Sequence, residues 1–328
     1  SSEARPCQQS CRDGLRMSAL LVGEGEEMNI TKMIQENIRA TASRRNDEGI
    51  ITAEGMIPRM DDKEYHRKHL DISYAGRTPA EKLDIFYPEE GDGPFPVFVE
   101  VHGGAWYFGQ KRSVEFEPFL YGLNRGYACV SLGYTLSPEG HYPLPVLEIK
   151  SAIRFLRVHA EEYKLDPSRI VLWGGSAGAH LAALAATSCD TGYLEEDLSG
   201  NIEVSAKPNA LVLWYGCFDY FEQGRYLEDW IYENFFGTEN LKDVEEALRQ
   251  SSPLMHLTKD SCPTFLQHGR ADQIVPFTQS TGYYERLCQV AGAEKGKLEI
   301  LDNCDHADEK MFAKENIQKV FDFADQCL

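Results

Sequence analysis

The sequence predicts an α/β fold in which helices cover both faces of a mostly parallel sheet of about eight strands. Short apolar runs of strand length alternate along the chain with longer stretches of helical spacing. Strands that alternate with helices pair in parallel and are buried on both faces, so their side chains are apolar almost throughout. The chain has 328 residues, of which 42% are hydrophobic and 26% charged. These values suit a large globular domain.

The predicted elements begin with a helix from Glu26 to Arg45, where apolar residues recur at helical spacing. The alternating runs His69–Tyr74 and Lys82–Tyr87 predict two strands, the second at an antiparallel edge. The other predicted strands are Val97–Val101, Ala128–Leu132, Ile170–Trp173, Ala210–Tyr215, Thr264–His268 and Leu298–Leu301. Helices are predicted between and after them at Glu115–Arg125, Pro145–Tyr163, Ala177–Thr187, Thr278–Ala291 and Lys310–Cys327.

Charge and cysteine content limit the partners. The formal net charge is -19, and phosphate binding needs a basic face, so we expect no nucleic-acid partner. No stretch approaches the ~20 apolar residues of a membrane span, so we expect no membrane partner either. The 9 cysteines are odd in number and lie mostly inside strand or helix patterns. They predict free thiols in a reducing compartment, the cytoplasm.

A candidate nucleophile, Ser176, stands in the spacing G-x-S-x-G over Gly174–Gly178. An apolar strand pattern precedes this stretch and a run of small helix-forming residues follows it. A strand that feeds a helix with almost no loop holds the serine in a strained conformation and exposes its hydroxyl. The glycines on either side leave room for the turn.

A second glycine-containing turn, His102–Trp106, follows the strand pattern that ends at Val101. Its backbone N–H groups are candidate donors to a reacting carbonyl, together with the N–H of the residue after the serine. We therefore expect an oxyanion hole made by Gly104, Ala105 and Ala177. The next side chains, Trp106, Tyr107 and Phe108, are predicted to line the substrate pocket; the alternative is that one or two of them pack beneath the loop.

A serine hydroxyl needs a base, and the base needs an acid that holds its tautomer. On this topology the order along the chain is serine, acid, histidine. His306 follows the last strand pattern and is the predicted base, whereas His180, His256 and His268 are expected to have structural roles. Asp272, after the preceding strand, is the predicted acid. Asp219 and Asp305 are the alternatives, and Asp305 is expected to be solvated.

The segment between Cys217 and Leu257 interrupts the alternation of strands and helices, and we interpret residues 217–258 as a lid over Ser176. The alternative is a pair of helices that fills its own core, and both can hold. The domain prediction is a leader at 1–25 that is disordered or extraneous, a helical extension at 26–64, and one domain at 65–328. The aromatic residues of the interrupting segment are Phe218, Tyr220, Phe221, Tyr226, Trp230, Tyr232, Phe235 and Phe236.

The ordered set of the HGGAW turn, the GGSAG stretch, the HGRADQIVP stretch and the late His306 resembles the α/β-hydrolase superfamily. Within it, residues 65–328 are similar to the esterase/lipase group with an HGG[GAY]W oxyanion turn. That group includes bacterial acetyl and feruloyl esterases and lies close to the hormone-sensitive-lipase-like and arylformamidase branches. The resemblance implies an α/β-hydrolase fold and triad roles for Ser176, Asp272 and His306. Two departures stand out: Ala105 replaces a third glycine, and no glycine follows His306.

The reaction we expect is ester hydrolysis through an acyl-enzyme, without a metal or organic cofactor. The predicted substrate is a small-molecule or oligosaccharide ester with a short acyl group or a hydroxycinnamoyl group. The aromatic lid favours the hydroxycinnamoyl group. An arylformamidase is the alternative enzyme, and a non-catalytic binding protein, which would be expected to lack a triad member, is the alternative class. A homodimer remains open as an alternative to a monomer.

Overall fold

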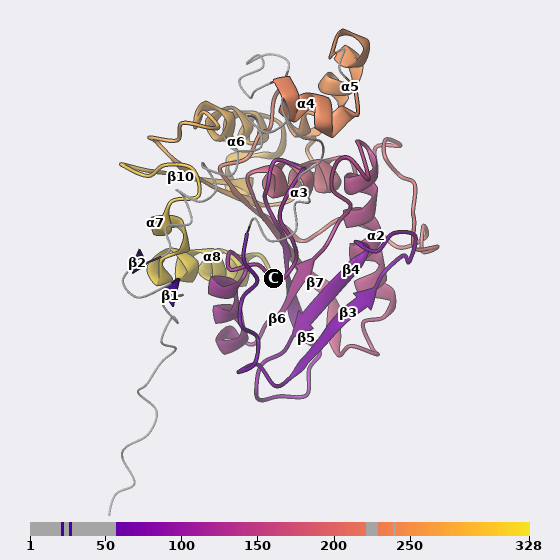
Figure 1. Ribbon diagram of the computed structural model, residues 1–328, viewed down its shortest axis with the longest axis vertical. Coiled ribbons are helices and arrows are strands. Elements are labelled where there is room, and N and C mark those ends of the chain that lie inside the picture. Colours follow the sequence, from indigo (N-terminus) through magenta and orange to yellow (C-terminus); the bar gives the residue numbers. More distant parts are fainter. Residues whose placement is uncertain (1–20, 23–25, 28–56, 221–228, 239–240) are drawn as a thin grey trace, which may run out of the picture.

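The computed structural model describes residues 21–22, 26–27, 57–220, 229–238 and 241–328. Its main sheet has 8 strands in the order β10-β9-β8-β7-β5-β6-β4-β3 (Figure 1). The pairs from β10 to β6 are parallel, and only β4 and β3 join the edge in antiparallel fashion. The fold is the predicted one. Its strands are β3 Lys68–Ser73, β4 Lys82–Phe86, β5 Phe95–Val101, β6 Ala128–Leu132, β7 Leu165–Gly175, β8 Ala210–Trp214, β9 Thr264–Gly269 and β10 Gly296–Leu301.

Helices cover both faces of this sheet and divide the core in two. One face packs against α2 (Leu144–Val158), α3 (Ala177–Thr187) and α6 (Thr278–Ala291), and the other against the 3-10 helix η1 (Glu117–Arg125) and α8 (Lys314–Cys327). Successive residues of a strand point to opposite faces. Each strand between β4 and β9 therefore contributes to both clusters, which is why its sequence is apolar almost throughout.

Several predicted bounds differ from the structure. The predicted helix at 310–327 is two helices, α7 (Glu309–Phe312) and α8, because Ala313 between them has extended backbone at φ -60 and ψ 142. The predicted helix at 115–125 is a 3-10 helix that begins at Glu117, and α2 ends at Val158 rather than Tyr163. At the N-terminal side, Glu26–Glu27 is strand β2, paired with β1 (Leu21–Val22). The rest of the helix predicted up to residue 45 lies outside the described residues.

The segment between β8 and β9 carries α4 (Asp229–Phe236), the 3-10 helix η2 (Leu241–Val244), α5 (Glu245–Gln250) and the 3-10 helix η3 (Pro253–His256), and α4 and α5 lie beyond α3 in Figure 1. The rings of Tyr232 and Phe235 are fully buried. Phe235 stacks on Trp106 of the glycine-containing turn, with ring centroids 4.4 Å apart. The segment therefore has a dry inner face that packs against that turn. Phe221 and Tyr226 lie outside the described residues.

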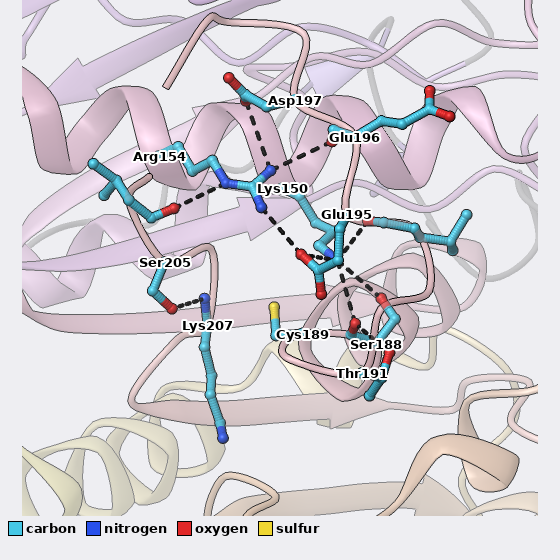
Figure 2. Close-up of polar contacts among 12 residues, drawn as sticks. Lys150, Arg154, Ser188, Cys189, Thr191, Glu195, Glu196, Asp197, Ser205 and Lys207 are labelled. Carbon is cyan, nitrogen blue, oxygen red and sulfur yellow. Dashed lines mark hydrogen bonds and ion pairs between the residues drawn. The ribbon is translucent and has the colours of Figure 1, made fainter. Parts of the chain in front are cut away.

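Lys150 and Arg154 of α2 form hydrogen bonds and ion pairs with the long connection between α3 and β8 (Figure 2). The buried ammonium of Lys150 donates to the carbonyl oxygen of Leu194 at 2.6 Å, and Arg154 Nε donates to that of Val204 at 2.9 Å. Arg154 also forms ion pairs with Glu195 and Asp197. Burial lowers the pKa of Lys150, which the neighbouring Glu195 counteracts.

The cysteines of the described part are all free thiols, in agreement with the expectation from the sequence. None of the helices in the described ranges is long and apolar enough to span a bilayer.

Candidate active site

The loop-free junction between β7 and α3 places Ser176 at the carboxyl edge of the sheet. Ser176 is a non-glycine residue with φ 54 and ψ -122, a strained conformation. Its N–H donates to the carbonyl oxygen of Trp214 at 2.9 Å, which ties the turn to the neighbouring β8. α3 begins at the next residue, so the N–H groups of its first turn have no acceptor within the helix and face the serine side.

The glycines around Ser176 are required by close backbone approach. A Cβ on Gly174 would lie 2.3 Å from the carbonyl oxygen of Gly178, and a Cβ on Gly178 would lie 2.0 Å from that of Val101. These distances are far below contact, and the atoms met are backbone atoms that cannot rotate away. The G-x-S-x-G spacing thus reflects how tightly α3 approaches β7 and β5.

Ser176, His306 and Asp272 form one hydrogen-bonded chain. His306 Nε2 lies 2.9 Å from Ser176 Oγ, and His306 Nδ1 lies 2.8 Å from Asp272 Oδ2. The imidazole is 1% exposed, and its ring lies edge-on to that of Tyr215 with centroids 4.7 Å apart. The three side chains come from the carboxyl ends of β7, β9 and β10, as the sequence predicts.

Asp272 is held by donors on both of its oxygens. Oδ1 accepts the N–H groups of Ile274 and Val275 at 2.9 and 2.8 Å, and Oδ2 lies 3.1 Å from His268 Nε2. Burial by itself raises the pKa of Asp272, but the neighbouring His306 and the hydrogen bonds from His268 and His306 outweigh it. They hold the pKa well below its usual range, so the carboxylate is ionised at any physiological pH.

The other histidines have the structural roles expected from the sequence. His268 Nε2 also lies 2.9 Å from the carbonyl oxygen of Val275, which can only accept, so this nitrogen carries the proton and points it toward Asp272 as well. His180 is fully buried, and its Nε2 lies 2.7 Å from the carbonyl oxygen of Ser251. His256 Nε2 lies 2.7 Å from that of Gln250.

The two alternative acids do not approach the imidazole of His306 as Asp272 does. Asp219 is buried in the segment after β8, where its N–H donates to Gln279 Oε1 at 2.8 Å. Asp305 is half-buried rather than solvated as expected. Its Oδ1 accepts the N–H groups of Gln273 and His306, so it links the loop of the acid to the loop of the histidine.

The glycine-containing turn has the backbone that an oxyanion hole needs. Gly104 has φ 114 and Ala105 has φ 50, both in the left-handed region. A Cβ on Gly103 would lie 3.5 Å from Ser176 Cβ, so the turn lies directly beside the serine. The N–H groups of Gly104 and Ala105 donate to no residue in the described ranges. His102 braces the turn: its ring stacks on that of Tyr134, and its Nδ1 lies 2.8 Å from the carbonyl oxygen of Gly103.

Two cavities adjoin Ser176, and both are lined in part by Ala105 of this turn. The first, the Ile231 cavity, is apolar and is lined by Ala105, Trp106, Ser176, Ala177, Cys217, Ile231, Ile274 and Val275. The second, the Glu115 cavity, is lined by Ile57, Gly103, Gly104, Ala105, Phe108, Glu115, Trp173, Gly175, Ser176, Tyr215, His306 and Ala307. The predicted pocket residues are thus divided: Trp106 lines one cavity, Phe108 the other, and Tyr107 neither.

Sequence reasoning missed Glu115 and Tyr215. Glu115 is 5% exposed and lies between the apolar residues Val114 and Phe116, with a second acid at Glu117. The sequence does not distinguish Glu115 from the neighbouring Glu117, so it gave no signal for the buried position of Glu115. Tyr215 directly follows β8 and has φ 37, a strained backbone that the sequence does not mark. Ile57, from before the first strand of the main sheet, also reaches the cavity.

This fold, with a strained serine at a strand–helix turn and a histidine–aspartate pair at the ends of the last two strands, is that of the α/β-hydrolases. The family model described as BD-FAE matches residues 83–287, more than half of the sequence, and the chain belongs to that family.

The sequence relatives include proteins named as ester hydrolases and proteins named as kynurenine formamidases. The chain is 32% identical over 230 residues to the probable carboxylic ester hydrolase LipM of Mycobacterium tuberculosis. The aligned region covers 67% of this chain and 52% of LipM. It is 28% identical over 242 residues to the kynurenine formamidase of Danio rerio. Here the aligned region covers 72% of this chain and 74% of that protein. The chain spans little more than half the length of the mycobacterial relatives that it matches.

Among solved structures, one described as a truncated form of carbohydrate esterase from gut microbiota has a TM-score of 0.73 and 23% sequence identity. The superposed region covers 82% of this chain and 98% of the chain of that structure. At this identity the likeness concerns the fold.

Proposed function

We propose that the protein is a serine carboxylesterase that hydrolyses short-chain or hydroxycinnamoyl esters through an acyl-enzyme. The hydrogen-bonded chain from Asp272 through His306 to Ser176 carries the proposal. The name of the relative LipM, a probable carboxylic ester hydrolase, supports the class of bond.

In this mechanism, His306 Nε2 takes the proton of Ser176 Oγ as the oxygen attacks the ester carbonyl. Asp272 keeps the proton of His306 on Nδ1 and stabilises the imidazolium that forms. The N–H groups of Gly104, Ala105 and Ala177 are the proposed donors to the oxyanion, an effect worth ~3 kcal/mol per donor. His306 then protonates the leaving alcohol, and a water molecule, activated by the same imidazole, releases the acid.

The acyl group is assigned to the Ile231 cavity. Its walls from Trp106, Ile231 and Val275 offer no charge to a ligand, which suits a hydrocarbon or aromatic acyl chain. We propose that residues 217–258 act as the lid of this cavity, since Cys217 and Ile231 come from that segment.

An arylformamidase is the second candidate, because a relative is a kynurenine formamidase. The formamide reaction uses the same serine chemistry. However, a formyl group carries only hydrogen on its carbonyl carbon and would leave the Ile231 cavity empty. The presence of this apolar cavity therefore favours the ester over the formamide.

The test is a set of parallel rate measurements with p-nitrophenyl acetate, p-nitrophenyl octanoate, methyl ferulate and N-formylkynurenine. The Ser176→Ala protein serves as the control for background reaction. Ester turnover that disappears in Ser176→Ala is the expected result, and the ranking of acyl groups measures the Ile231 cavity. A preference for the formamide would favour the second candidate. An absence of serine-dependent turnover would overturn both enzymes.

A further inference from the structure

The Glu115 cavity contains a buried carboxyl group that the proposed mechanism does not use. Glu115 is 5% exposed, and no hydrogen bond or ion pair joins its carboxyl oxygens to a residue of the described ranges. Burial raises the pKa of Glu115 to about 7, against the opposite effect of the neighbouring His306. A carboxyl that is largely withdrawn from water and has gained no donor is costly. A ligand that brings a hydrogen-bond donor into the cavity would supply the partner that this carboxyl lacks.

The side of the serine on which Glu115 lies is the side of the leaving alcohol. His306 must give its proton to the alcohol oxygen, so the alcohol has to lie against the imidazole. His306 lines the Glu115 cavity and not the Ile231 cavity. If the Ile231 cavity takes the acyl group, the alcohol is directed past His306 toward Glu115.

A second polar group stands on the same wall. The ring of Tyr215 contacts that of His306, and a Cβ on Gly175 would lie 3.0 Å from the Tyr215 hydroxyl oxygen. The hydroxyl is therefore next to the residue that precedes Ser176. A carboxyl acceptor and a hydroxyl that both donates and accepts are thus available to one ligand.

We propose that Glu115 is a specificity-determining residue that accepts a hydrogen bond from a hydroxyl group of a polyhydroxylated leaving alcohol, such as a sugar, with the Tyr215 hydroxyl as a second contact. This inference rests on the proposed esterase function and names the alcohol for it. An alcohol without further hydroxyl groups leaves the carboxyl unpaired, so the site discriminates against it.

The experiment compares two acetate esters that share the acyl group and differ in hydroxylation of the alcohol. These are a mono-O-acetylated methyl xyloside and cyclohexyl acetate, with acetate release measured for both. The proteins are the wild type, Glu115→Leu, Glu115→Gln and Glu100→Gln. Glu100 is the matched control, since it is also a buried acid whose pKa burial raises, to about 8, but it does not line the cavity.

We expect the wild type to prefer the xyloside ester. Glu115→Leu should lower kcat/KM for the xyloside ester by about tenfold or more and change that for cyclohexyl acetate by less than about twofold. Glu115→Gln keeps the size of the side chain and tests the same inference if the leucine variant does not fold. We expect it to lose the preference for the xyloside ester to a smaller extent. Glu100→Gln should keep the ratio of the wild type.

Equal losses on both esters would overturn the inference, because they would mean that Glu115 acts through His306 or through the fold. An unchanged ratio in both Glu115 variants would overturn it as well. The failure of the proposed function has a different signature, namely that no hydrolysis of cyclohexyl or p-nitrophenyl acetate depends on Ser176.

Discussion

The carboxylate of Asp272 receives donors from both histidines and from the backbone of the loop that follows it. The two N–H groups on Oδ1 fix the direction of the carboxylate, and Oδ2 is left to orient His306. His268 therefore has an indirect part: it donates to the same Oδ2 that orients His306. The sequence predicted a structural His268, but the carboxylate that it contacts is visible only in the folded protein.

Asp272→Asn tests this arrangement at the scale of a single residue. The amide cannot stabilise an imidazolium, and it favours the wrong tautomer of His306. We expect kcat for p-nitrophenyl acetate to fall by about 10⁴-fold, as in comparable triads. The control is Asp305→Asn, which alters a carboxylate that accepts the backbone N–H groups of Gln273 and His306 but does not contact the imidazole as Asp272 does. A fall of similar size in both variants would contradict the assignment.

The raised pKa of Glu115 also affects the stability of the protein. Its pKa is raised from 4.5 to about 7, so the folded state holds this proton up to a higher pH than the unfolded chain does. The contribution of Glu115 to stability is present below about pH 4.5 and is lost as the pH rises through about 7. The titratable groups around it are His306, Tyr215, Glu100 and Tyr134.

Glu115→Gln should therefore stabilise the protein more at about pH 8 than at about pH 5. The gain at the higher pH is at most about 3 kcal/mol, the free energy that corresponds to the shift in pKa. Thermal unfolding of wild type and variant at both pH values measures the difference. A gain in stability that does not depend on pH would contradict the prediction, because it would mean that ionisation of Glu115 does not destabilise the folded state.

At the scale of elements, the strands were predictable and the helix ends less so. Parallel strands buried on both faces are near-continuous apolar runs, and β6 has the predicted bounds. The break between α7 and α8 has no glycine or proline to mark it. Ala313 takes extended backbone where Met311 and Phe312 are buried on the sheet, and this packing is not local information.

Gly178→Ala tests how closely α3 approaches β5. The added methyl group would meet the carbonyl oxygen of Val101 at 2.0 Å, so β5 and α3 would have to separate. We expect a loss of more than about 3 kcal/mol in the free energy of unfolding. Gly200→Ala is the control, because a Cβ there meets nothing within 4 Å and only its φ of 79 is unfavourable. Its expected cost is about 1 kcal/mol, and equal costs for both variants would contradict the packing argument.

The position of α4 makes a second prediction at this scale. Ile231 is 2% exposed and forms a wall of the Ile231 cavity. Ile231→Phe adds volume there and should shorten the acyl chain that fits. We expect kcat/KM for p-nitrophenyl butyrate to fall relative to that for the acetate by about tenfold. A parallel change for the two esters would assign the acyl group elsewhere.

At the scale of the whole molecule, the site follows from the topology. Parallel strands end at one edge of the sheet, so residues that follow β7, β9 and β10 meet there although up to 130 positions separate them. This is why the order of serine, acid and histidine in the sequence was sufficient to predict that Ser176, Asp272 and His306 meet at this edge. Glu115, Tyr215 and Ile57 were missed because their side chains reach the site from loops whose direction only tertiary packing determines.

The net charge of the molecule gives a prediction that no single residue carries. With a formal net charge of -19, the acidic side chains repel one another more strongly in the compact folded state than in the unfolded chain. At an ionic strength of about 0.01 M this repulsion acts over ~30 Å, and at about 1 M over only ~3 Å. We therefore expect sodium chloride to raise the Tm at about pH 8 by about 2 °C or more over this range. At about pH 5, close to the sequence pI of about 4.9, the same titration should leave the Tm almost unchanged. A Tm that falls with salt at the higher pH would mean that ion pairs such as that of Lys111 with Asp84 outweigh the overall repulsion.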